Sequence, residues 1–403
     1  MKLYKKHISD LGKVITGKTP RTSILENYGG KIPFLTPSDN LSEKFSPTTS
    51  KTLTKIGLNE VKNCLLPSKS ICVSCIGSDL GKVVLTKNPT VTNQQFNSIV
   101  PNEENDADFI YYLMTVVGKH LNYLSKTSTA VPIINKSTFA NYEIEIPNIK
   151  EQKRIGKILS SLDDKIELNR RINDNLEQQA QALFKSWFVD NPDSNWKKIS
   201  LSEVASFVGG YSYTGKELTD FSNVAMATIK NFMRNGGFKA EGFKGINPSA
   251  KLKECHYANL FDILVAHTDL TQNADVIGNA ELLLTCGKYN SIIFSMDLVK
   301  VLPKEIFPYS FLLAAMLKNK MFKGHCLGYI NGTTVLHLNK KALPEFEIRK
   351  PSDSEAKIMN ETLAPYYKRM AKLLQETDKL ISLRDTLLPK LMSGELKIND
   401  INN

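Results

Sequence analysis

The sequence has no long apolar run and few cysteines, and each absence argues against a class of protein. The apolar stretch at 311–317 spans only seven residues, whereas a membrane-spanning helix needs about 20. The basic residues within 1–12 are followed by no apolar stretch, so we do not expect a secretory signal. The six cysteines are irregularly spaced, which argues against a disulfide framework and favours a reducing, cytoplasmic location without a membrane partner.

Acidic residues are in the minority. The chain has 52 Lys and Arg residues against 41 Asp and Glu residues, which gives a formal net charge of +11. An excess of this size, spread along the chain, favours a polyanionic partner, most simply nucleic acid. With 403 residues, of which 41% are hydrophobic, the chain is long enough for two or three domains with sizeable cores.

Two segments half a chain apart repeat each other. Residues 128–187 align with 332–391 without an insertion, at a constant offset of 204. The match includes Val131 with Val335, Asn135 with Asn339, Lys136 with Lys340, Glu143 with Glu347, and Pro147 with Pro351. The stretches before them correspond more loosely, as in the strand-like runs 70–74 and 262–266. Variable loops on a standard frame would produce this contrast.

The two domain-sized stretches, 1–148 and 191–350, share a composition. Both mix β-branched runs with turns marked by Gly and Pro, and each contains one helical pattern, at 107–124 and 309–322. We therefore predict an α+β fold class, with two α/β-mixed domains related by the internal repeat.

The segments 149–190 and 351–396 carry heptad spacing instead, and a short tail follows at 397–403. Apolar residues that recur every seven positions indicate a coiled-coil seam. The predicted seam consists of Ile155, Leu159, Leu162, Ile166, Leu176, Leu183 and Trp187, with Met359, Leu363, Tyr366, Met370, Leu373, Leu380, Leu387 and Leu391. Two long helices packed as an antiparallel coiled coil fit this paired register better than helices that each pack only on their own domain.

Polar residues and prolines interrupt that seam. Asn169, Asn173, Thr377 and Arg384 occupy seam positions, where polar side chains cost stability but select one register. Pro365 and Pro389 predict a kink or an early end of the second helix. From 155 to 187 the first helix would measure about 50 Å at ~1.5 Å per residue, or roughly 15 base pairs of DNA.

The most specific sequence motifs lie at the ends of the two predicted helices. The first helix opens with Glu-Gln-Lys-Arg-Ile at 151–155 and closes with Leu-Phe-Lys-Ser-Trp-Phe at 183–188; the second closes with Leu-Leu-Pro-Lys-Leu-Met-Ser-Gly-Glu-Leu at 387–396. Together they make the chain resemble the specificity subunit of type I restriction–modification systems. The resemblance implies that 1–148 and 191–350 are target-recognition domains, each reading one half of an interrupted, asymmetric target in double-stranded DNA.

The same resemblance implies the division of labour with partner chains. The helices would set the gap between half-sites and dock two methyltransferase subunits, and restriction/translocase subunits would complete the complex. This chain would be non-catalytic and bind no cofactor itself, while S-adenosylmethionine, ATP and Mg would belong to the partner subunits. The resemblance does not identify base-contacting residues in this sequence, because recognition domains of the family vary too much in sequence.

Candidate DNA contacts therefore come from the residue types in polar loops. Arg, Asn and Gln suit base edges, and Lys and Arg suit phosphates. The loops are 36–40, 74–82, 93–97 and 126–129 in the first domain, and 230–234, 267–273 and 331–337 in the second. The candidates are Lys18, Arg21, Ser38, Asn40, Lys82, Gln94, Gln95, Asn97, Lys136, Lys230, Asn231, Arg234, Lys244, His267, Thr271, Gln272, Asn273, Asn331, Thr333 and Lys340.

Several motifs point elsewhere. Residues Gly12–Thr19 match the phosphate-loop pattern letter for letter, but polar residues precede them and Pro20 follows, where a strand and a helix are required. Asp39 with Glu60 and Lys62 faintly resembles a nuclease site. Cys72 and Cys75 form a lone C-x-x-C without the second pair of a zinc site, so no metal site is predicted.

The prediction is thus a non-catalytic, sequence-specific DNA-binding subunit. The alternatives are a nucleotide-dependent or nuclease enzyme that uses Gly12–Thr19 or Asp39, Glu60 and Lys62, and a coiled-coil adaptor without sequence preference. ATPase or nuclease activity of the isolated chain would support the first alternative. Equal affinity for random and selected DNA would support the second.

Overall fold

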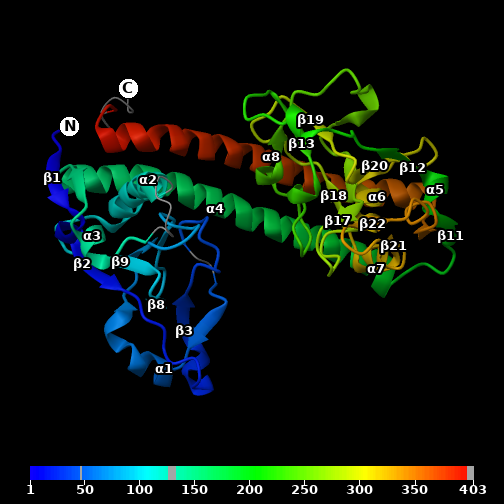
Figure 1. The fold of residues 1–403 in the computed structure, drawn as a ribbon. Helices are drawn as coiled ribbons and strands as arrows, with labels where there is room; N and C mark the ends of the chain where they lie inside the picture. The colour runs from blue at the N-terminus through cyan, green and yellow to red at the C-terminus, as the bar shows by residue number, and fades with distance from the viewer. Residues whose placement is uncertain (46–47, 126–132, 397–403) are drawn as a thin grey trace. The chain divides into compact units, whose positions relative to one another are not determined.

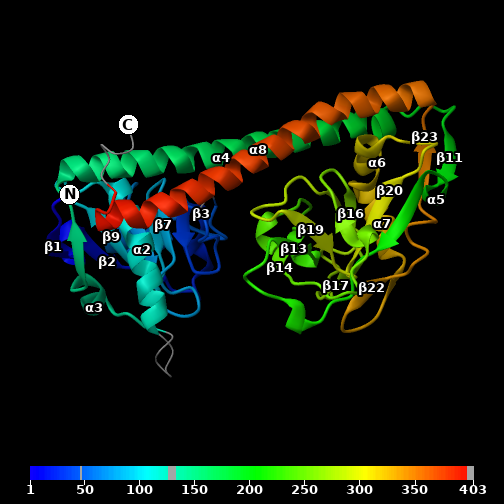
Figure 2. The same cartoon turned by 90° about the horizontal axis from the view of Figure 1, so that it is seen from above.

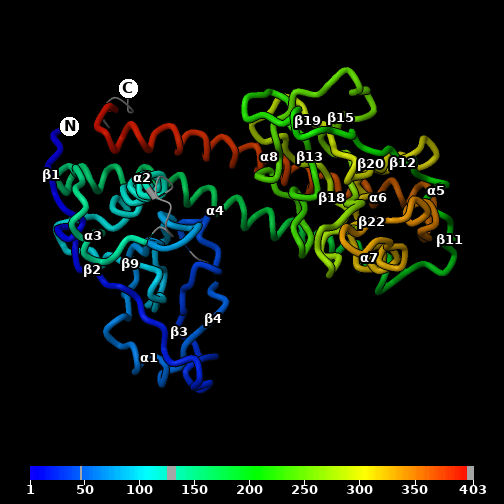
Figure 3. Tube along the Cα trace, in the orientation of Figure 1, coloured from blue at the N-terminus to red at the C-terminus, as the bar shows by residue number. Residues whose placement is uncertain are grey.

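The computed structural model describes residues 1–45, 48–125 and 133–396. The chain divides into two compact units: unit 1 comprises Met1–Ile166 and Leu380–Asn403, and unit 2 comprises Glu167–Lys379. Figure 1 labels their helices and strands, Figure 2 shows the same ribbon from above, and Figure 3 traces the chain as a tube. The predicted loop 126–129, Val131 of the repeat and the tail 397–403 lie outside the described residues.

The described residues of unit 1 form three β-sheets. A two-stranded antiparallel sheet pairs β1 (Tyr4–His7) with β10 (Glu143–Ile146). A four-stranded antiparallel sheet has the order β2 (Gly12–Thr16), β9 (Phe96–Pro101), β6 (Ile71–Ser74), β7 (Val83–Leu85). A second four-stranded sheet has the order β4 (Lys51–Leu53), β3 (Tyr28–Leu35), β8 (Thr90–Thr92), β5 (Leu65–Leu66), in which only β3 and β8 run parallel.

Short helices connect these strands, and one long helix covers them. The short ones are η1 (Ile8–Leu11), η2 (Leu25–Asn27), α1 (Lys55–Glu60), η3 (Lys62–Cys64) and α3 (Lys136–Ala140). The predicted helix at 107–124 is confirmed as α2 (Ala107–Ser125). Its apolar residues join those of β6 and β7 in one core, so α2 covers one face of the β2–β9–β6–β7 sheet.

Unit 2 repeats the three sheets in the same order. A two-stranded sheet pairs β11 (Lys197–Ser200) with β23 (Glu347–Lys350). The two four-stranded sheets are β12 (Ala205–Gly209), β20 (Leu298–Pro303), β16 (Ile263–Ala266), β18 (Ala280–Leu282), and β14 (Lys244–Gly245), β13 (Val224–Ala227), β19 (Ser291–Phe294), β15 (Tyr257–Ala258). As in unit 1, one pair of neighbours in the second sheet, β13 and β19, is parallel.

Unit 2 adds a small sheet, β17 (Thr268–Asp269), β22 (Leu336–Leu338), β21 (Ile330–Asn331). Its short helices are α5 (Leu201–Val204), η5 (Gly215–Glu217), η6 (Ile229–Asn231), η7 (Ala240–Gly242) and η8 (Glu254–His256). The single helix predicted at 309–322 is wrong: α6 (Ser310–Leu317) ends and α7 (Lys320–Leu327) begins anew. The reason is Asn319, whose side chain accepts from the Met321 and Phe322 N–H groups and caps a fresh helix.

Each of the two long helices is divided between the two units. Helix α4 runs over Ile149–Lys185 and ends in one π-turn, Ser186–Asp190, while α8 runs over Asp353–Ser393. Asn148 caps α4 by accepting from the Glu151 N–H (3.1 Å), and Ser352 with Glu355 forms a reciprocal cap on α8. No helix in the described part of the chain is long and apolar enough to cross a membrane.

The expected early end of α8 at a proline does not occur. The helix continues through Pro365 and Pro389 to Ser393. Both prolines are exposed, so the carbonyl that loses its helical hydrogen bond at each position can be solvated.

Within each unit, α4 and α8 run side by side in opposite directions (Figures 1 and 2). In unit 1, Ile155 and Leu159 share one core with Leu388 and Leu391. None of the fifteen seam residues is exposed. The same core contains the apolar face of α2, so the helices pack both on each other and on their domain; the two arrangements we contrasted from the sequence occur together.

Polar seam residues pair across the helices. In unit 1, Arg384 Nη1 contacts Asp163 Oδ1 at 2.7 Å. In unit 2, the fully buried Asn169 amide donates to Glu376 Oε2 (3.2 Å) and to Thr377 Oγ1 (3.4 Å). Because a slipped register would leave these buried polar groups without partners, the pairs favour a single antiparallel alignment.

Candidate nucleic-acid interface

Loops from four parts of unit 1 meet where β2, β6 and β8 end and β9 begins. The Lys18 N–H donates to Thr92 O (2.9 Å), and the Cys75 N–H donates to Gln95 O (2.8 Å). The Ile134 N–H in turn donates to Cys75 O (2.9 Å). These bonds hold together residues 17–21, 75–82, 93–95 and 133–136, which we call edge 1.

Unit 2 builds a matching edge from equivalent bonds. The Tyr211 N–H donates to Phe294 O (2.7 Å), and the His267 N–H donates to Asp297 O (2.8 Å). The Leu338 N–H donates to His267 O (2.9 Å). Residues 210–214, 267–279, 295–297 and 331–338 form edge 2. Two loop clusters with the same backbone connections therefore carry different side chains.

Edge 1 presents unneutralised positive charge. Lys18 and Lys136 are both exposed, and no carboxylate of a described residue pairs with either. Both ammonium groups act on Cys64, where they oppose the rise in thiol pKa caused by burial. Exposed lysines without a carboxylate partner suit contact with phosphates.

The other two cations near edge 1 have partners. Arg21 contacts Glu60 through its guanidinium (3.1 Å), and its backbone N–H donates to the same carboxylate (3.0 Å). Lys82 contacts Asp79 (2.6 Å). Exposed ion pairs of this kind add little stability, so both side chains can exchange a carboxylate for a phosphate.

Edge 1 also offers hydrogen-bonding side chains at defined positions. Gln94 is exposed, and its Oε1 accepts from the Thr19 hydroxyl (2.7 Å). Gln95 is half-buried and accepts from Asn93 Nδ2 (2.8 Å). Ser38 and Asn40 are exposed on the loop after β3, where Asn40 also accepts from the Ser42 N–H (3.0 Å).

Edge 2 is held in shape by one carboxylate. Asp269 is 2% exposed and accepts from the N–H groups of Thr271 (2.8 Å) and Val276 (2.6 Å). Burial alone would raise the pKa of Asp269, but these hydrogen bonds and those from the Thr271 hydroxyl and the Ile277 N–H outweigh it and lower the pKa. The charged carboxylate thus fixes the loop that presents Gln272 and Asn273, both exposed.

Other candidates of unit 2 surround that loop. Gln272 Nε2 donates to Thr333 O (2.6 Å), which ties the loop to the exposed residues Asn331 and Thr333. Burial lowers the pKa of His267, and the proximity of His337 and Lys340 lowers it further. Lys340 is exposed, like Lys230, whereas Lys244 is half-buried.

Arg234 lies beside edge 2 on a neighbouring loop. Its side chain is 74% exposed, and Nε is 3.5 Å from Asp275 Oδ2. The loop is fastened to edge 2 because Asn279 Nδ2 donates to Met233 O (3.1 Å). A forked, exposed guanidinium on a fixed loop suits bidentate contact with guanine.

Two of the predicted contact residues are buried and bonded within the domain. Asn97 is 3% exposed, accepts from the Thr16 hydroxyl (2.7 Å) and donates to Ile134 O (3.1 Å). Asn231 is fully buried, accepts from the Thr228 N–H (2.9 Å) and donates to Lys239 O (2.9 Å). The Asn97 amide joins β2 to the segment before α3, and the Asn231 amide braces its own turn. A sequence cannot distinguish these uses of asparagine from base reading.

The residues of the rejected motifs have other uses. Gly12–Thr16 form strand β2 rather than a loop before a helix. Asp39 accepts from the Thr36 (2.7 Å) and Ser50 (2.6 Å) N–H groups. The described residues contain no group of three or more His, Cys, Asp or Glu side chains placed to hold a metal ion.

The C-x-x-C pair does not form a site. Cys72 and Cys75 lie in different cores, so the two thiols face opposite sides of the strand. Burial raises the pKa of Cys72 to about 12 and that of Cys75 to about 11, and both remain protonated thiols at pH 7.

Sequence reasoning missed two lysines, with side chains only 7% and 14% exposed, that attach each domain to α4. In unit 1, Lys44 Nζ contacts Asp108 (2.6 Å) and Ser160 on α4 (2.8 Å). In unit 2, Lys318 contacts Glu177 on α4 (3.0 Å) and Glu281 on β18 (2.5 Å). Burial lowers the pKa of Lys318, but the two carboxylates outweigh it and raise the pKa, so the amine stays charged. No local pattern marks these residues.

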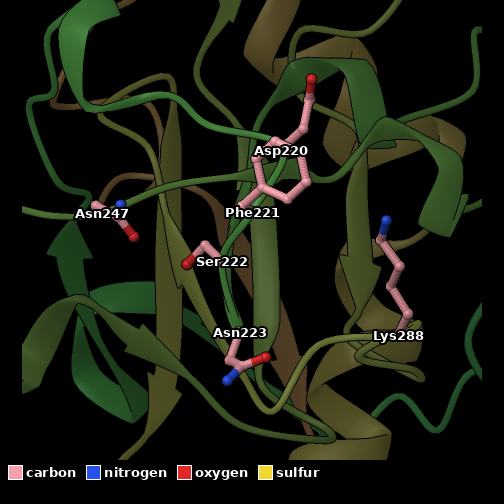
Figure 4. A pocket seen from close by; sticks show the side chains of 6 residues that line it. All are labelled: Asp220, Phe221, Ser222, Asn223, Asn247 and Lys288. Atoms are coloured by element: carbon pink, nitrogen blue, oxygen red, sulfur yellow. The ribbon is translucent and has the colours of Figure 1, made fainter.

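One hollow of unit 2 is lined by no residue of edge 2. It has a volume of about 550 Å³ and is lined by Asp220, Phe221, Ser222, Asn223, Asn247 and Lys288. Figure 4 shows these side chains spread around a wide opening rather than converging on one point. Phe221 is 92% exposed. An open, polar hollow of this kind does not enclose a small ligand.

Comparisons with known proteins match the whole architecture. A family model described as the type I restriction modification DNA specificity domain matches residues 2–178 and 193–382. The MjaIX specificity subunit of Methanocaldococcus jannaschii is 25% identical over 424 residues, covering 98% of this chain and 94% of that protein. The HindI specificity subunit of Haemophilus influenzae is 37% identical over 176 residues, covering 42% of this chain and 38% of that protein.

A solved structure shares the fold. The S subunit of the type I restriction–modification system from M. genitalium aligns with a TM-score of 0.58 at 18% identity, covering 97% of this chain and 96% of that one.

Proposed function

Because the chain belongs to the family of type I restriction–modification DNA specificity subunits, we propose that it reads double-stranded DNA in two halves, one with each edge. The observation that carries this proposal is the repetition of one backbone scaffold. Edge 1 and edge 2 are closed by equivalent hydrogen bonds, yet their exposed side chains differ. Two different readers on one scaffold suit an asymmetric, bipartite target.

The division of contacts follows from side-chain chemistry. Lys18 and Lys136 in unit 1, and Lys230 and Lys340 in unit 2, would contact phosphates, because they are exposed and pair with no carboxylate among the described residues. Gln94, Arg234 and Gln272 would contact base edges. The phosphate contacts would supply affinity, and the base contacts would supply sequence preference.

We assign the helices α4 and α8 to spacing and assembly. Apolar side chains outside the seam are exposed on them: Leu168 (47%), Ile358 (64%) and Leu383 (47%). Exposed apolar residues on a helix pair suit docking of two methyltransferase subunits, with restriction/translocase subunits joining the full complex. The chain itself would be non-catalytic and act in the cytoplasm; S-adenosylmethionine, ATP and Mg would serve the partner subunits.

Methylome sequencing tests this proposal. A host that carries only this chain and its cognate methyltransferase should methylate one interrupted motif with a fixed gap. Absence of any sequence preference would contradict the proposal and support the adaptor alternative. ATPase or nuclease activity of the purified chain that disappears in Lys18→Ala or Asp39→Ala would support the enzyme alternative.

A heptad insertion tests the spacing role separately. Seven residues added to α4 and seven to α8 lengthen an antiparallel pair by about 10 Å, or roughly three base pairs. The methylated motif should keep both half-sites and acquire a longer gap. An unchanged gap in an active complex would rule out the helices as the spacer.

A further inference from the structure

A three-residue turn at the centre of edge 1 is braced by its own first residue. The Asn93 N–H donates to Leu35 O (3.1 Å), which fixes the start of the turn. Asn93 Oδ1 accepts from the Gln95 N–H (3.1 Å), and its Nδ2 donates to Gln95 Oε1 (2.8 Å). The middle residue, Gln94, takes no part in this brace and is exposed.

Unit 2 contains the same turn with other residues. The Ser295 N–H donates to Ala227 O (2.9 Å). Ser295 Oγ accepts from the Asp297 N–H (3.3 Å) and donates to Asp297 Oδ2 (3.1 Å). The middle residue is Met296, which is 58% exposed. Each bond of the first turn has its counterpart here, so Gln94 and Met296 occupy equivalent positions.

Both middle residues stand where the loops of their edge meet. In unit 1, the Cys75 N–H donates to the carbonyl of Gln95, the residue after Gln94, at 2.8 Å. In unit 2, the His267 N–H donates to the carbonyl of Asp297, the residue after Met296, also at 2.8 Å. The Met296 N–H also donates to Tyr211 O (3.0 Å). The side chain at this position is therefore presented by a fixed backbone.

The two side chains suit different base edges. A glutamine amide can bond adenine in the major groove with both its oxygen and its nitrogen, and the Thr19 hydroxyl orients the Gln94 amide while leaving its NH2 group to donate. Methionine offers no such pair. The apolar group that base edges display in the major groove is the C5-methyl of thymine, and a flexible, polarizable thioether packs well against a methyl group.

We propose that Gln94 and Met296 occupy one specificity-determining position that is used twice: Gln94 reads an adenine, and Met296 contacts the methyl group of a thymine. This inference rests on the proposed function and assigns a reading residue in each unit. Single exposed apolar side chains are common on protein surfaces. Met296 differs from them because a doubly braced turn holds it in register with a glutamine.

Removing thymine methyl groups tests the role of Met296 without altering the protein. In the complex of this chain with its cognate methyltransferase, each thymine of the selected target is replaced in turn by deoxyuridine. One replacement, in the half-site read by unit 2, should weaken binding roughly fourfold, the factor that corresponds to one buried methyl group. A scan in which no such replacement weakens binding would overturn the inference.

Substitutions at the two turns provide the second test. Met296→Gln should lose the sensitivity to deoxyuridine at that one position and prefer adenine there in selection from random DNA. Gln94→Met should change one position of the other half-site from adenine to thymine. Met321→Gln is the matched control, because Met321 is 65% exposed but lies on α7, and its motif should equal that of the unmodified chain.

The outcomes separate this inference from the function on which it rests. A complex of the unmodified chain that selects no sequence at all overturns the proposed function together with the inference. A complex that selects a bipartite motif, yet keeps that motif unchanged in Met296→Gln and Gln94→Met, overturns the inference alone.

Discussion

Units 1 and 2 have the same sheets in the same order but present different loops. In unit 1, the loop after β6 spans 75–82 and meets the segment before α3 at the isolated bridge of Ile76 with Ile133. In unit 2, the corresponding loop spans 267–279, contains β17 and pairs with β22. Strand order is held by burial and ladder hydrogen bonds, whereas loop tips meet solvent and are free to differ. A repeated frame can therefore carry two unlike recognition surfaces.

The attachment of each unit to α4 shows a second contrast. Lys44 faces one close carboxylate, on Asp108, and lies over the Tyr112 ring at 5.1 Å. Lys318 faces two carboxylates, on Glu177 and Glu281, and the latter is 3% exposed. Lys44 thus combines one ion pair with a cation–π contact and a hydrogen bond to Ser160 on α4, whereas Lys318 is held by two carboxylates.

The largest expected effect comes from breaking these attachments. Lys318→Ala leaves two carboxylates without their cation and should lower the free energy of unfolding of unit 2 by about 3–5 kcal/mol. Lys44→Ala should cost unit 1 only about 1–3 kcal/mol, because Asp108 retains Lys69 at 3.8 Å. Both tryptophans, Trp187 and Trp196, belong to unit 2, so urea unfolding followed by tryptophan fluorescence reports on that unit.

Circular dichroism, which reports on the whole chain, completes that measurement. Lys318→Ala should shift the fluorescence transition, and Lys44→Ala should shift only the dichroism transition. The exposed Lys320 supplies the control, since Lys320→Ala should move neither transition by more than about 0.5 kcal/mol. Equal losses in the two buried variants would show that the second carboxylate of unit 2 is unimportant.

Arg234→Ala sharpens the comparison between the edges. The substitution should cost about 1–3 kcal/mol of discrimination at one base pair and leave the half-site of unit 1 unchanged. Selection from random DNA by the complex with methyltransferase measures both halves together. Arg349→Ala is the matched control, because Arg349 is exposed on β23, away from edge 2. Changes in both half-sites would mean that the units do not read independently.

Asp269→Asn should loosen edge 2 without affecting edge 1. The Thr271 and Val276 N–H groups donate to different oxygens of Asp269, and an amide has only one acceptor oxygen, so Asn cannot keep both bonds. The N–H group that loses its acceptor should exchange with solvent faster, by about 1 kcal/mol of protection for each lost bond. Because the pKa of Asp269 is lowered on folding, its stabilisation is present above the unfolded pKa of about 3.9 and is lost as the pH falls through the lower folded value.

Hydrogen exchange followed by mass spectrometry resolves the Asp269 effect by segment. Peptides from 267–279 should exchange faster in the variant at pH 7, while those from 75–82 should match the unmodified chain. Unchanged exchange of 267–279 would show that the loop is held by its side-chain packing instead.

Phosphate contacts should give the smallest effect and the least local one. Lys18→Ala should weaken DNA binding to a similar degree for every sequence, and it should reduce the slope of log affinity against log salt by about 1. Lys340→Ala should do the same through unit 2. Lys87→Ala is the control, because Lys87 is exposed but follows β7 away from edge 1. A sequence-dependent loss in Lys18→Ala would indicate a base contact.

Much of the architecture was accessible from local patterns. Heptad spacing over 155–187 and 359–391 predicted the helix pair because each turn of a helix repeats its buried face every three or four residues. The repeat from Asn135 to Asn339 predicted paired domains, and apolar spacing predicted α2. Breaks that depend on one polar residue were harder: Asn319 starts a new helix where the apolar pattern runs on.

The candidate site was only partly accessible. Residue type alone selected Gln94 and Asn97 together, although one is exposed and the other buried three residues away. Met296 was overlooked because an apolar residue in a loop is not a conspicuous DNA contact. Its equivalence to Gln94 depends on the hydrogen bonds of both turns.

The sequence by itself determined the doubled frame, the paired helices and the family, because these depend on periodic burial that every turn or strand records locally. The tertiary structure alone decided which polar side chains reach solvent, which lysines are buried against α4, and which residues share a position in the two edges. Such facts depend on hydrogen bonds and packing between segments far apart in the chain, such as Asp269 with Val276 or Lys318 with Glu177, and no local pattern encodes those partners.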